Sequence, residues 1–368
     1  MNNAIKSFLR KVLGNQNYQR IAQPIKTVRY LKFKIKGHLL KRPVHILLTR
    51  YSGLGDVLMA TPAIRMLKKI YPRAFIVFDT SKEGKEILKG NPYIDKITVD
   101  SSRLMENNFN WHFHLSYEYF PHLHIVDSYL KCIGAKGRIK NEEKKPIIIL
   151  SDSDREFAKR FLCSHNLSEH NLLIGVHAQA GYEQRRWPLK NFVKVLDYME
   201  KKYSVKIIEF GADNQPTVGK GISLVGKCTV KQSAAVLQKC SLLICNDSLI
   251  LHVAGALDIP VVAIFGPAPP WTRLPFNNVS FGCWAKEGCR GCLLHQKDLS
   301  KFGMDCDKGF PECMYAVKSE EVVKTIEKLL QICVFNKKPF GNVLKCLEKD
   351  YGVRYPIGIK EVDKGKIP

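Results

Sequence analysis

The chain has 368 residues and a formal net charge of +24 at pH 7, from 58 Lys or Arg against 34 Asp or Glu. This length predicts two domains, each large enough to bury its own core. No apolar run reaches the ~20 residues that a membrane-spanning helix needs, and the N-terminus carries no continuous apolar signal region, so we expect a protein that stays in the cytoplasm. The charge favours an acidic partner: a nucleic acid, an anionic lipid surface or a phosphorylated substrate.

Residues 1–42 form a basic extension that holds eleven Lys or Arg and no Asp or Glu. Apolar residues such as Ile5, Phe8 and Val12 recur among these charges. Basic helical stretches with one apolar face lie on anionic membrane surfaces, so we expect this extension to hold the protein on the inner face of the cytoplasmic membrane. A nucleic-acid arm and a solvated tail are the alternatives, and no RNA-binding motif accompanies the charge.

Beyond the extension, short apolar runs alternate with helix-period segments, which is typical of parallel α/β units. The predicted strands of the first half cover residues 44–49, 74–78, 94–99 and 112–115, and its helices cover 56–70, 82–89 and the stretch from 121. The predicted strands of the second half cover residues 172–177, 205–210, 222–225, 242–245 and 261–265, and its longer helices cover 152–164, 189–202, 230–239 and 319–333. A polar connection over residues 136–146 separates the halves.

The first strand-turn-helix segment reads VHILLTRYSGLGDVLMATPAIRMLKKIYP over residues 44–72. Gly53 and Gly55 permit a tight turn after the strand, and Asp56 follows at the start of a helix. Pro62 is expected to bend that helix or to relax its first turns. On position alone, Asp56 would be an ordinary helix cap.

The second such segment reads LLICNDSLILHVAGALDIPVVAIFGP over residues 242–267. Asn246, Asp247 and Ser248 fall between a buried strand and a short helix, where backbone N–H groups and the positive end of the helix dipole can hold a phosphate. The alternative is that Asp247 or Ser248 simply caps the helix.

Together, the two segments resemble glycosyltransferase family 9, the bacterial ADP-heptose:lipopolysaccharide heptosyltransferases. The family's R-x-S-x-L-G-D and T-P-A motif is matched by Arg50, Ser52, Leu54, Gly55, Asp56, Thr61, Pro62 and Ala63. Its N-D-S/T turn, the histidine after it and the I-P-V-V-A-x-F-G-P motif are matched by Asn246, Asp247, Ser248, His252 and residues 259–267.

The resemblance covers residues 44–335 and implies an α/β fold of GT-B type, in which two Rossmann-like, doubly wound domains face a central cleft. It implies an acceptor-side domain over residues 43–150, a nucleotide-sugar-binding domain over 151–335 and a C-terminal tail over 336–368. The activity that it implies is an inverting transfer of heptose from ADP-heptose to the phosphorylated inner core of lipopolysaccharide.

The resemblance also implies residue roles. Asp56 would be the catalytic base that takes the proton of the acceptor hydroxyl. Arg185, the helix start at Asp247 and Ser248, and His252 would neutralise the leaving ADP, so that catalysis requires no cofactor. The donor-binding residues that the resemblance implies are Ser52, Gly53, Gly55, Arg185, Asp213, Asn246, Asp247, Ser248, Leu249 and His252.

Leu249 departs from the family, which usually has glycine directly after Asn-Asp-Ser. A glycine lets a diphosphate approach the backbone, whereas a leucine side chain narrows or reshapes the pocket. Another nucleotide sugar therefore remains open as the donor, as does a protein as the acceptor. Two interpretations of other classes are a catalytically silent nucleotide-sugar-binding protein and a nucleic-acid-binding protein; the retained motif residues argue against both.

Twelve cysteines in a protein expected in the cytoplasm argue for reduced thiols. Five of them lie near one another in the sequence: Cys283, Cys289, Cys292, Cys306 and Cys313. Cys289 and Cys292 have the Cys-x-x-Cys spacing of half a thiolate site, whereas Cys306 and Cys313 are spaced more widely. A structural zinc or iron site and a set of free thiols are both open, and disulfides are disfavoured.

Two other groups invite a metal hypothesis. One comprises four histidines, at positions 112, 114, 122 and 124, for which contacts to an acceptor phosphate or the lining of the site are the preferred roles. The other is the pair Asp152 and Asp154, which more simply caps the helix that follows.

Overall fold

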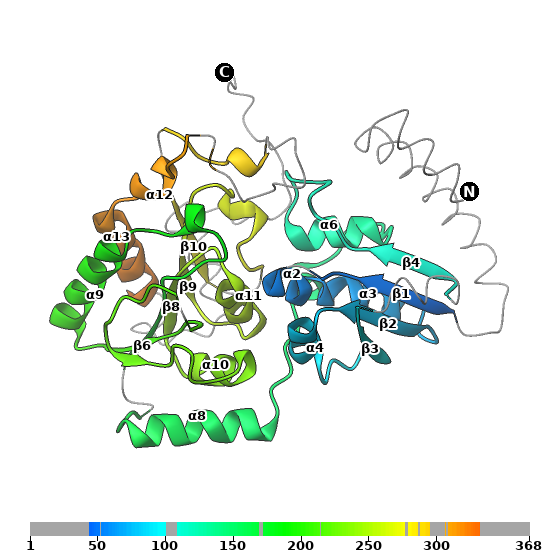
Figure 1. Ribbon diagram of the computed structural model, residues 1–368, viewed down its shortest axis with the longest axis horizontal. Helices are drawn as coiled ribbons and strands as arrows, with labels where there is room; N and C mark the ends of the chain where they lie inside the picture. The colour runs from blue at the N-terminus through cyan, green and yellow to red at the C-terminus, as the bar shows by residue number, and fades with distance from the viewer. Residues whose placement is uncertain are drawn as a thin grey trace.

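The computed structural model describes residues 44–51, 53–100, 109–168, 172–213, 215–276, 279–285, 288–294, 306 and 308–331. These residues form two parallel β-sheets with helices packed on them (Figure 1). The basic extension over residues 1–42, Ser52 and the tail over 336–368 lie outside the described residues.

The N-terminal sheet has the strand order β3-β2-β1-β4, and all of its strand pairs are parallel. Its strands are β1 (His45–Thr49), β2 (Phe75–Thr80), β3 (Lys96–Val99) and β4 (Trp111–His114). Its helices are α2 (Leu54–Met59), α3 (Thr61–Ile70), α4 (Lys82–Leu88), α6 (Ile125–Cys132) and the short α7 (Asn141–Lys144). Ile46, Leu47 and Leu48 of β1 are fully buried, as expected for a central parallel strand with both faces covered.

The helix predicted over residues 56–70 is in fact two helices, α2 and α3, which meet at Ala60. Pro62 lies at the start of α3, where its missing N–H costs no helical hydrogen bond. Thr61 donates a side-chain hydrogen bond to the carbonyl of Leu58 (2.8 Å) at the break. The proline therefore ends one helix and begins the next, which leaves α2 as a short element.

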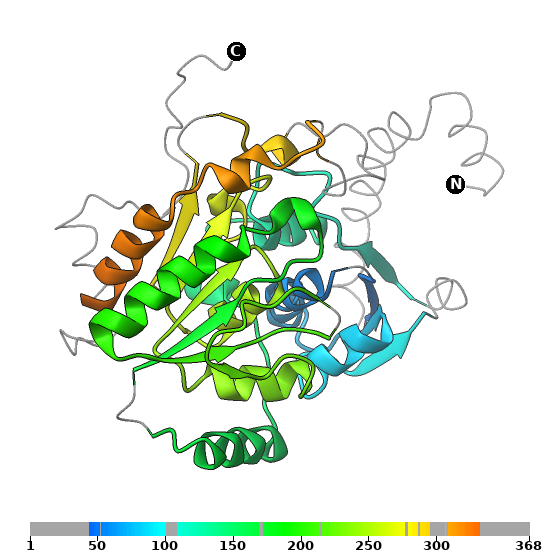
Figure 2. The same cartoon turned by 60° about the vertical axis from the view of Figure 1, so that its left-hand side comes forward.

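The C-terminal sheet has the strand order β10-β9-β8-β5-β6-β7 and is parallel throughout. Its strands are β5 (Leu173–His177), β6 (Lys206–Glu209), β7 (Ile222–Ser223), β8 (Leu242–Asn246), β9 (Val261–Phe265) and β10 (Ser280–Trp284). Its helices are α8 (Asp152–Ser164), α9 (Leu189–Tyr203), α10 (Val230–Leu237), α11 (Leu249–Ala256), α12 (Glu312–Tyr315) and α13 (Ser319–Leu330). Helices α9 and α13 lie side by side over this sheet (Figure 2).

Each strand predicted from the sequence is present, and β10 is an additional strand that the sequence did not indicate. A short turn of 3₁₀ helix, η3 (Pro270–Thr272), precedes β10 in place of a full crossover helix. The helix expected from residue 121 begins only at Ile125, because the His124 side chain caps it by accepting from the backbone N–H of Val126 (3.2 Å).

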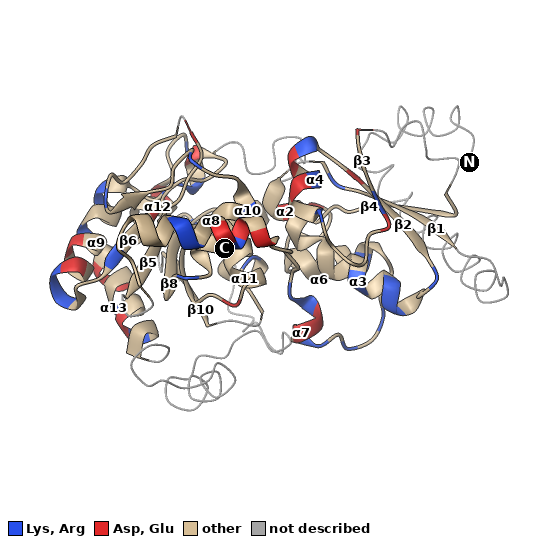
Figure 3. Cartoon of the chain, turned by 90° about the horizontal axis from the view of Figure 1, so that it is seen from below, with Lys and Arg blue, Asp and Glu red and all other residues tan. Residues whose placement is uncertain are grey.

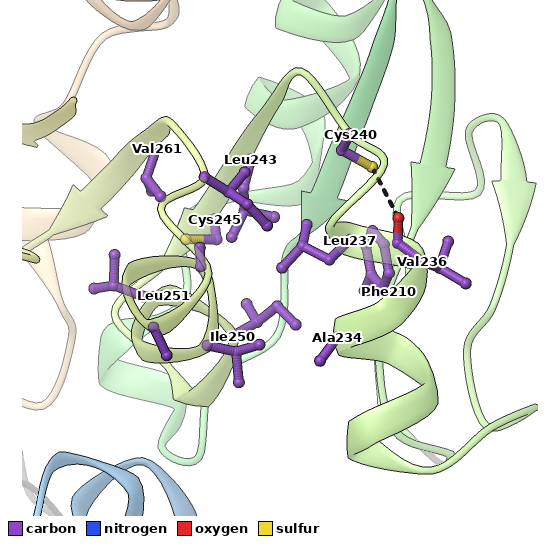
Figure 4. Close-up of a cluster of buried hydrophobic side chains, with 14 of the residues drawn as sticks. Phe210, Ala234, Val236, Leu237, Cys240, Leu243, Cys245, Ile250, Leu251 and Val261 are labelled. Atoms are coloured by element: carbon purple, nitrogen blue, oxygen red, sulfur yellow. Dashed lines mark hydrogen bonds between the residues drawn. The ribbon is translucent and has the colours of Figure 1, made fainter. Parts of the chain in front are cut away.

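The two halves pack directly against each other through α2 and α11 (Figure 1). Leu58 of α2 belongs to the same buried cluster as Ile250 and Leu251 of α11, and Figure 4 shows the part of this cluster around α10, α11 and β8. Gly55 makes this approach possible, since a Cβ there would lie 2.7 Å from Cδ2 of His252. The two sequence segments that carry the motifs are therefore in contact in the fold.

Lys and Arg are spread over both halves and gather on no single element in the view of Figure 3. Over the described part of the chain, no helix combines the length and the apolar composition needed to cross a bilayer.

Candidate active site

Arg50 comes directly after β1, and Glu118 lies in the loop after β4. Since β1 and β4 are neighbouring parallel strands, their carboxyl ends bring the two side chains to the same edge of the sheet. Arg50 donates hydrogen bonds from Nη2 to Asp56 Oδ2 (2.6 Å) and to Glu118 Oε1 (2.8 Å), and from Nη1 to Glu118 Oε2 (3.0 Å). One buried guanidinium thus holds two carboxylates, and Glu118 is a site residue that the motifs did not include.

Asp56 is the third residue of α2 and makes no helix cap. Its side chain turns back toward the loop, where Gly53 has a φ of 73° and where a Cβ would overlap the Asp56 carboxylate. The side chain of Asp56 is 17% exposed. The tight turn expected at Gly53 is confirmed, and it places Asp56 against Arg50 instead of at a cap position.

The two carboxylates differ in their acid-base properties. Burial raises the pKa of Asp56 above its ordinary value, although the charges of Arg50 and Arg273 oppose this shift. Burial also acts against ionisation of Glu118, but the hydrogen bonds from Arg50 outweigh it, and the pKa of Glu118 is lowered. The surroundings therefore make Glu118 more acidic than an ordinary glutamate and Asp56 more basic than an ordinary aspartate.

Aromatic rings enclose this ion-pair network. The Arg50 guanidinium lies 5.1 Å from the ring centroid of Tyr117 and 6.0 Å from that of Tyr129. Arg273, from the loop after β9 in the other half, lies 4.8 Å from the same Tyr117 ring. Burial raises the pKa of Tyr117 to about 12, so its hydroxyl stays protonated at neutral pH. The sequence motifs indicated none of Tyr117, Tyr129 and Arg273.

The C-terminal half contributes a second group of side chains, at the ends of β5 and β8. Arg185, which ends the 3₁₀ turn η2 (Glu183–Arg185), has its Nη1 3.5 Å from Asp247 Oδ2. Ser248 Oγ and His177 Nδ1 are 3.2 Å apart. The Asn246 amide is already engaged, because it donates to the carbonyl of Ala178 (2.6 Å) and accepts from the backbone of Trp187 (3.2 Å). Asn246 thus fixes the loop that carries Arg185.

Three buried polar atoms in this group have no hydrogen-bond partner among the described residues: Arg185 Nε, Asp247 Oδ2 and His252 Nδ1. Buried polar groups are normally satisfied, since each unsatisfied one costs about 1–3 kcal/mol. Asp247 Oδ2 has only its ion pair with Arg185, and the other two atoms have no hydrogen bond, so the three side chains indicate a place for a polar ligand. Burial lowers the pKa of His252 to about 4, so the positive charge toward such a ligand comes from Arg185.

Two other predicted donor residues, Leu249 and Asp213, lie in different parts of the structure. Leu249 is partly buried against the shared hydrophobic cluster, and its Cα lies 3.5 Å from the Cβ position of Gly55. Asp213 is exposed beyond β6, with its carboxylate against Gly226. Among the described residues, no contact joins Asp213 to Arg185, Asp247 or His252.

The cysteines separate into two sets. Burial, together with the charges of Cys289, Cys292 and Cys306, raises the pKa of Cys313 to about 12, so these four thiols are near enough to interact. Cys283, by contrast, is buried on β10 with its Sγ 3.7 Å from Thr325 Oγ1. Cys283 and Cys313 both belong to the same buried cluster, but Cys283 is not among the thiols that interact with Cys313. Within the described ranges, no three Cys, His, Asp or Glu side chains are arranged to hold a metal ion.

Local hydrogen bonds engage residues of the two other metal hypotheses. Asp154 accepts from the backbone N–H (2.8 Å) and the hydroxyl (2.6 Å) of Ser151, so it caps α8 as expected. His112 and His114 both contact Thr49 Oγ1, at 3.2 and 3.0 Å, whereas His124 caps α6. His112 and His114 thus share one hydroxyl, and His124 lies at the start of α6. No group of three or more metal-ligating side chains is found in the part of the chain that the structure describes.

Comparisons with known proteins agree with this arrangement. Residues 100–302 match glycosyltransferase family 9 (heptosyltransferase), a range that includes Arg185, Asp247 and His252 and begins after Asp56. The chain is 26% identical over 171 residues to lipopolysaccharide heptosyltransferase 2 of Salmonella typhimurium, covering 42% of this chain and 49% of that protein. The chain thus spans about half the length of this curated relative.

Two solved structures share the fold. The glycosyltransferase family 9 protein from Veillonella parvula superposes with a TM-score of 0.61 at 21% identity, covering 78% of this chain and 97% of that one. TibC, an iron-containing dodecameric glycosyltransferase from enterotoxigenic E. coli H10407, superposes with a TM-score of 0.58 at 16% identity, covering 79% of this chain and 77% of that one. These structures confirm the predicted α/β fold of GT-B type. Because the matched range exceeds half of its residues, the chain belongs to glycosyltransferase family 9.

Proposed function

We propose that this protein is an inverting glycosyltransferase that transfers a heptose from ADP-heptose to the inner core of lipopolysaccharide. The observation that carries the proposal is the direct contact between α2 and α11. This contact brings the Asp56 carboxylate to the same region of the molecule as the buried polar atoms of Arg185, Asp247 and His252 that lack a hydrogen bond. We assign the acceptor side to a domain over residues 43–150 and the donor side to a domain over residues 151–335.

In the proposed reaction, the Asp56 carboxylate takes the proton of the acceptor hydroxyl. The hydroxyl oxygen then forms a bond to the anomeric carbon of the heptose as the bond from that carbon to the diphosphate breaks. ADP leaves with the bonding electrons, and the configuration at the anomeric carbon inverts. The raised pKa of Asp56 suits this role, since a more basic carboxylate accepts a proton more readily.

Arg50 and Glu118 position the base. The two hydrogen bonds between Arg50 and Glu118 fix the guanidinium, and the guanidinium in turn fixes Asp56 at 2.6 Å. On the donor side, Arg185 would face the diphosphate and offset its developing charge. The ionised carboxylate of Asp247 has only hydrogen-bond acceptors, so it would accept hydrogen bonds from sugar hydroxyls.

Calorimetry with the purified protein tests this proposal. ADP-heptose is compared with ADP, UDP, GDP and their sugars, each with and without a chelator. We expect selective binding of ADP-heptose that survives chelation, followed by transfer to an inner-core acceptor. Preference for another nucleotide sugar would replace the donor and direct attention to Leu249, and transfer to a polypeptide would replace the acceptor. Tight binding without turnover on any acceptor would identify a non-catalytic nucleotide-sugar-binding protein.

We further propose that residues 1–42 hold the enzyme on an anionic membrane surface, at the inner face of the cytoplasmic membrane. The support is the composition of this segment, with eleven cations, no acidic residue and interspersed apolar side chains. Deletion of residues 1–42 is expected to abolish sedimentation with vesicles that contain anionic lipid, while vesicles of neutral lipid bind neither form. Unchanged sedimentation of the deleted protein would contradict the assignment.

We also propose that Cys289, Cys292, Cys306 and Cys313 hold a structural zinc or iron ion. Cys289 and Cys292 have the Cys-x-x-Cys spacing of half a thiolate site, and thiolates bind either metal. The fold relative TibC is described as iron-containing. Metal analysis of the purified protein is expected to give about one equivalent, lost when Cys289 and Cys292 are replaced by serine. Replacement of Cys283, which lies in the core, is expected to leave the metal content unchanged.

A further inference from the structure

Arg273 is a buried cation with few partners. The residue is 4% exposed, and among the described residues its side chain donates one hydrogen bond, from Nη1 to the carbonyl of Thr272 (3.2 Å). Arg50 and Arg185 each have a carboxylate within 4 Å, whereas Arg273 forms no ion pair within the described part of the chain. A guanidinium has five N–H donors, so the described residues leave most of the Arg273 donors unused.

The position of Arg273 is fixed by its own loop. Thr272 Oγ1 donates to the carbonyl of Pro269 (2.7 Å), and the carbonyl of Leu274 meets His124 Nε2 of the other half (3.0 Å). Gly282 of β10 lets Pro270 pack closely, since a Cβ there would lie 2.6 Å from Cβ of Pro270. Residues on both sides of Arg273 are thus held, so the guanidinium is presented at a defined place.

That place is beside the candidate base. The guanidinium lies 4.8 Å from the ring of Tyr117, the same ring that lies 5.1 Å from Arg50. The charge of Arg273 acts to lower the pKa of Asp56 and also that of His252, so it reaches both the base and the donor group. A C-terminal cation therefore enters the N-terminal part of the site.

A buried guanidinium is unfavourable unless an anion or an aromatic ring compensates its charge. The face of Tyr117 supplies part of this compensation through a cation–π contact. The unused donors remain available to an oxyanion, and the planar fork of arginine matches a phosphate in a bidentate manner.

We propose that Arg273 binds a substrate phosphate next to Asp56. This inference rests on the proposed function, which supplies two sources of phosphate: the diphosphate of the donor and a phosphate group on the acceptor. Bound to the donor, Arg273 would act with Arg185 to offset the negative charge that develops on the leaving diphosphate. Bound to the acceptor, it would orient the attacking hydroxyl toward Asp56.

Arg273→Gln tests the proposal, with Arg273→Lys as a second variant that keeps the charge and loses the fork. Arg290→Gln is the control at the surface: Arg290 is exposed, but it also lies over an aromatic ring, that of Trp284 at 4.8 Å, and donates to the carbonyl of Ala285. Calorimetry with inorganic pyrophosphate and with ADP probes the donor source. The KM for inner-core oligosaccharide, intact or treated with phosphatase, probes the acceptor source. Thermal unfolding verifies that each variant is folded.

If the donor is the source, Arg273→Gln weakens pyrophosphate and ADP binding at least tenfold. If the acceptor is the source, nucleotide binding is unchanged and the KM for the intact acceptor rises at least tenfold, with no change for the treated one. Folded variants with wild-type values in all of these measurements would overturn the proposal. If the variant lost pyrophosphate binding but the wild type transferred no heptose, Arg273 would still be a phosphate-binding residue and ADP-heptose would be rejected as the donor. If the wild type bound neither pyrophosphate nor any nucleotide, both the role of Arg273 and the proposed function would be rejected.

Discussion

Replacing Asp56 with asparagine is expected to lower kcat for transfer by about 10²- to 10⁴-fold, the range that a general base contributes. The affinity for ADP-heptose should stay within about twofold of wild type, because the amide keeps the shape of the side chain and Arg50 keeps Glu118 as its partner. Single-turnover kinetics with isotopically labelled donor measure the first quantity, and calorimetry measures the second.

The same substitution has a predictable effect on stability. Burial raises the pKa of Asp56, so this carboxyl stabilises the fold when protonated, and its contribution is lost as the pH rises through the folded pKa. At pH 7, Asp56→Asn should therefore be at least as stable as wild type. For the wild type, the rate of transfer should fall as the pH decreases, because the base becomes protonated. The midpoint of this fall should lie at a higher pH than the ordinary pKa of an aspartate.

Asp127→Asn is a suitable control, because Asp127 lies in the first turn of α6 and pairs with Lys144 at 2.7 Å. It should retain wild-type transfer. Equal loss of donor binding and turnover in Asp56→Asn, or a lower melting temperature, would assign Asp56 a structural role in place of catalysis.

The strands were predictable because parallel strands buried on both faces appear as short apolar runs. The runs that became β1, β8 and β9 are almost entirely buried, as their composition indicated. The strand β10 escaped prediction, since its sequence SFGCW is short, contains a glycine and follows a 3₁₀ turn where a helix would mark a crossover. The helix break at Pro62 was only half anticipated, because either a bend or a new helix start is compatible with a proline in that pattern.

The site residues that were predicted lie within the two motifs, where local chain geometry decides the outcome. Gly53 and Asp56 are an example: the positive φ of the glycine determines where the carboxylate points. Glu118 and Arg273 could not be found in this way. Glu118 reaches Arg50 only because β4 pairs with β1, and Arg273 reaches Tyr117 only because the two halves dock. Long-range pairing of this kind leaves no periodic signal in the sequence.

Leu249 shows how a departure from a motif acquires meaning from packing. The leucine contributes to the hydrophobic cluster that α2 and α11 share, directly beside Gly55. It therefore adds buried apolar contact at the point where the halves meet. The side chain that was expected to reshape the donor pocket also stabilises the docking of the two sheets.

Replacing Arg185 with methionine is expected to weaken ADP binding by about 10- to 100-fold, since a hydrogen bond to a charged group contributes about 1.5–3 kcal/mol and 1.4 kcal/mol corresponds to a factor of ten. Methionine keeps the apolar stem and removes the guanidinium. The loss also leaves the buried carboxylate of Asp247 without its ion-pair partner 3.5 Å away, and this negative charge would repel a diphosphate. Calorimetry with ADP measures the effect.

Arg186→Met provides the control within the same loop. Arg186 is the next residue, but its Nε and Nη2 donate to the carbonyl of Ala180 at 3.3 and 3.2 Å, so it should bind ADP as wild type does. Adding Asp247→Asn to Arg185→Met should restore thermal stability, because the unpaired carboxylate is gone, without restoring ADP affinity, because the cation is still missing. If the double variant recovered ADP binding, the role of Arg185 would be to neutralise Asp247, and the diphosphate would have to be held by other cations of the site.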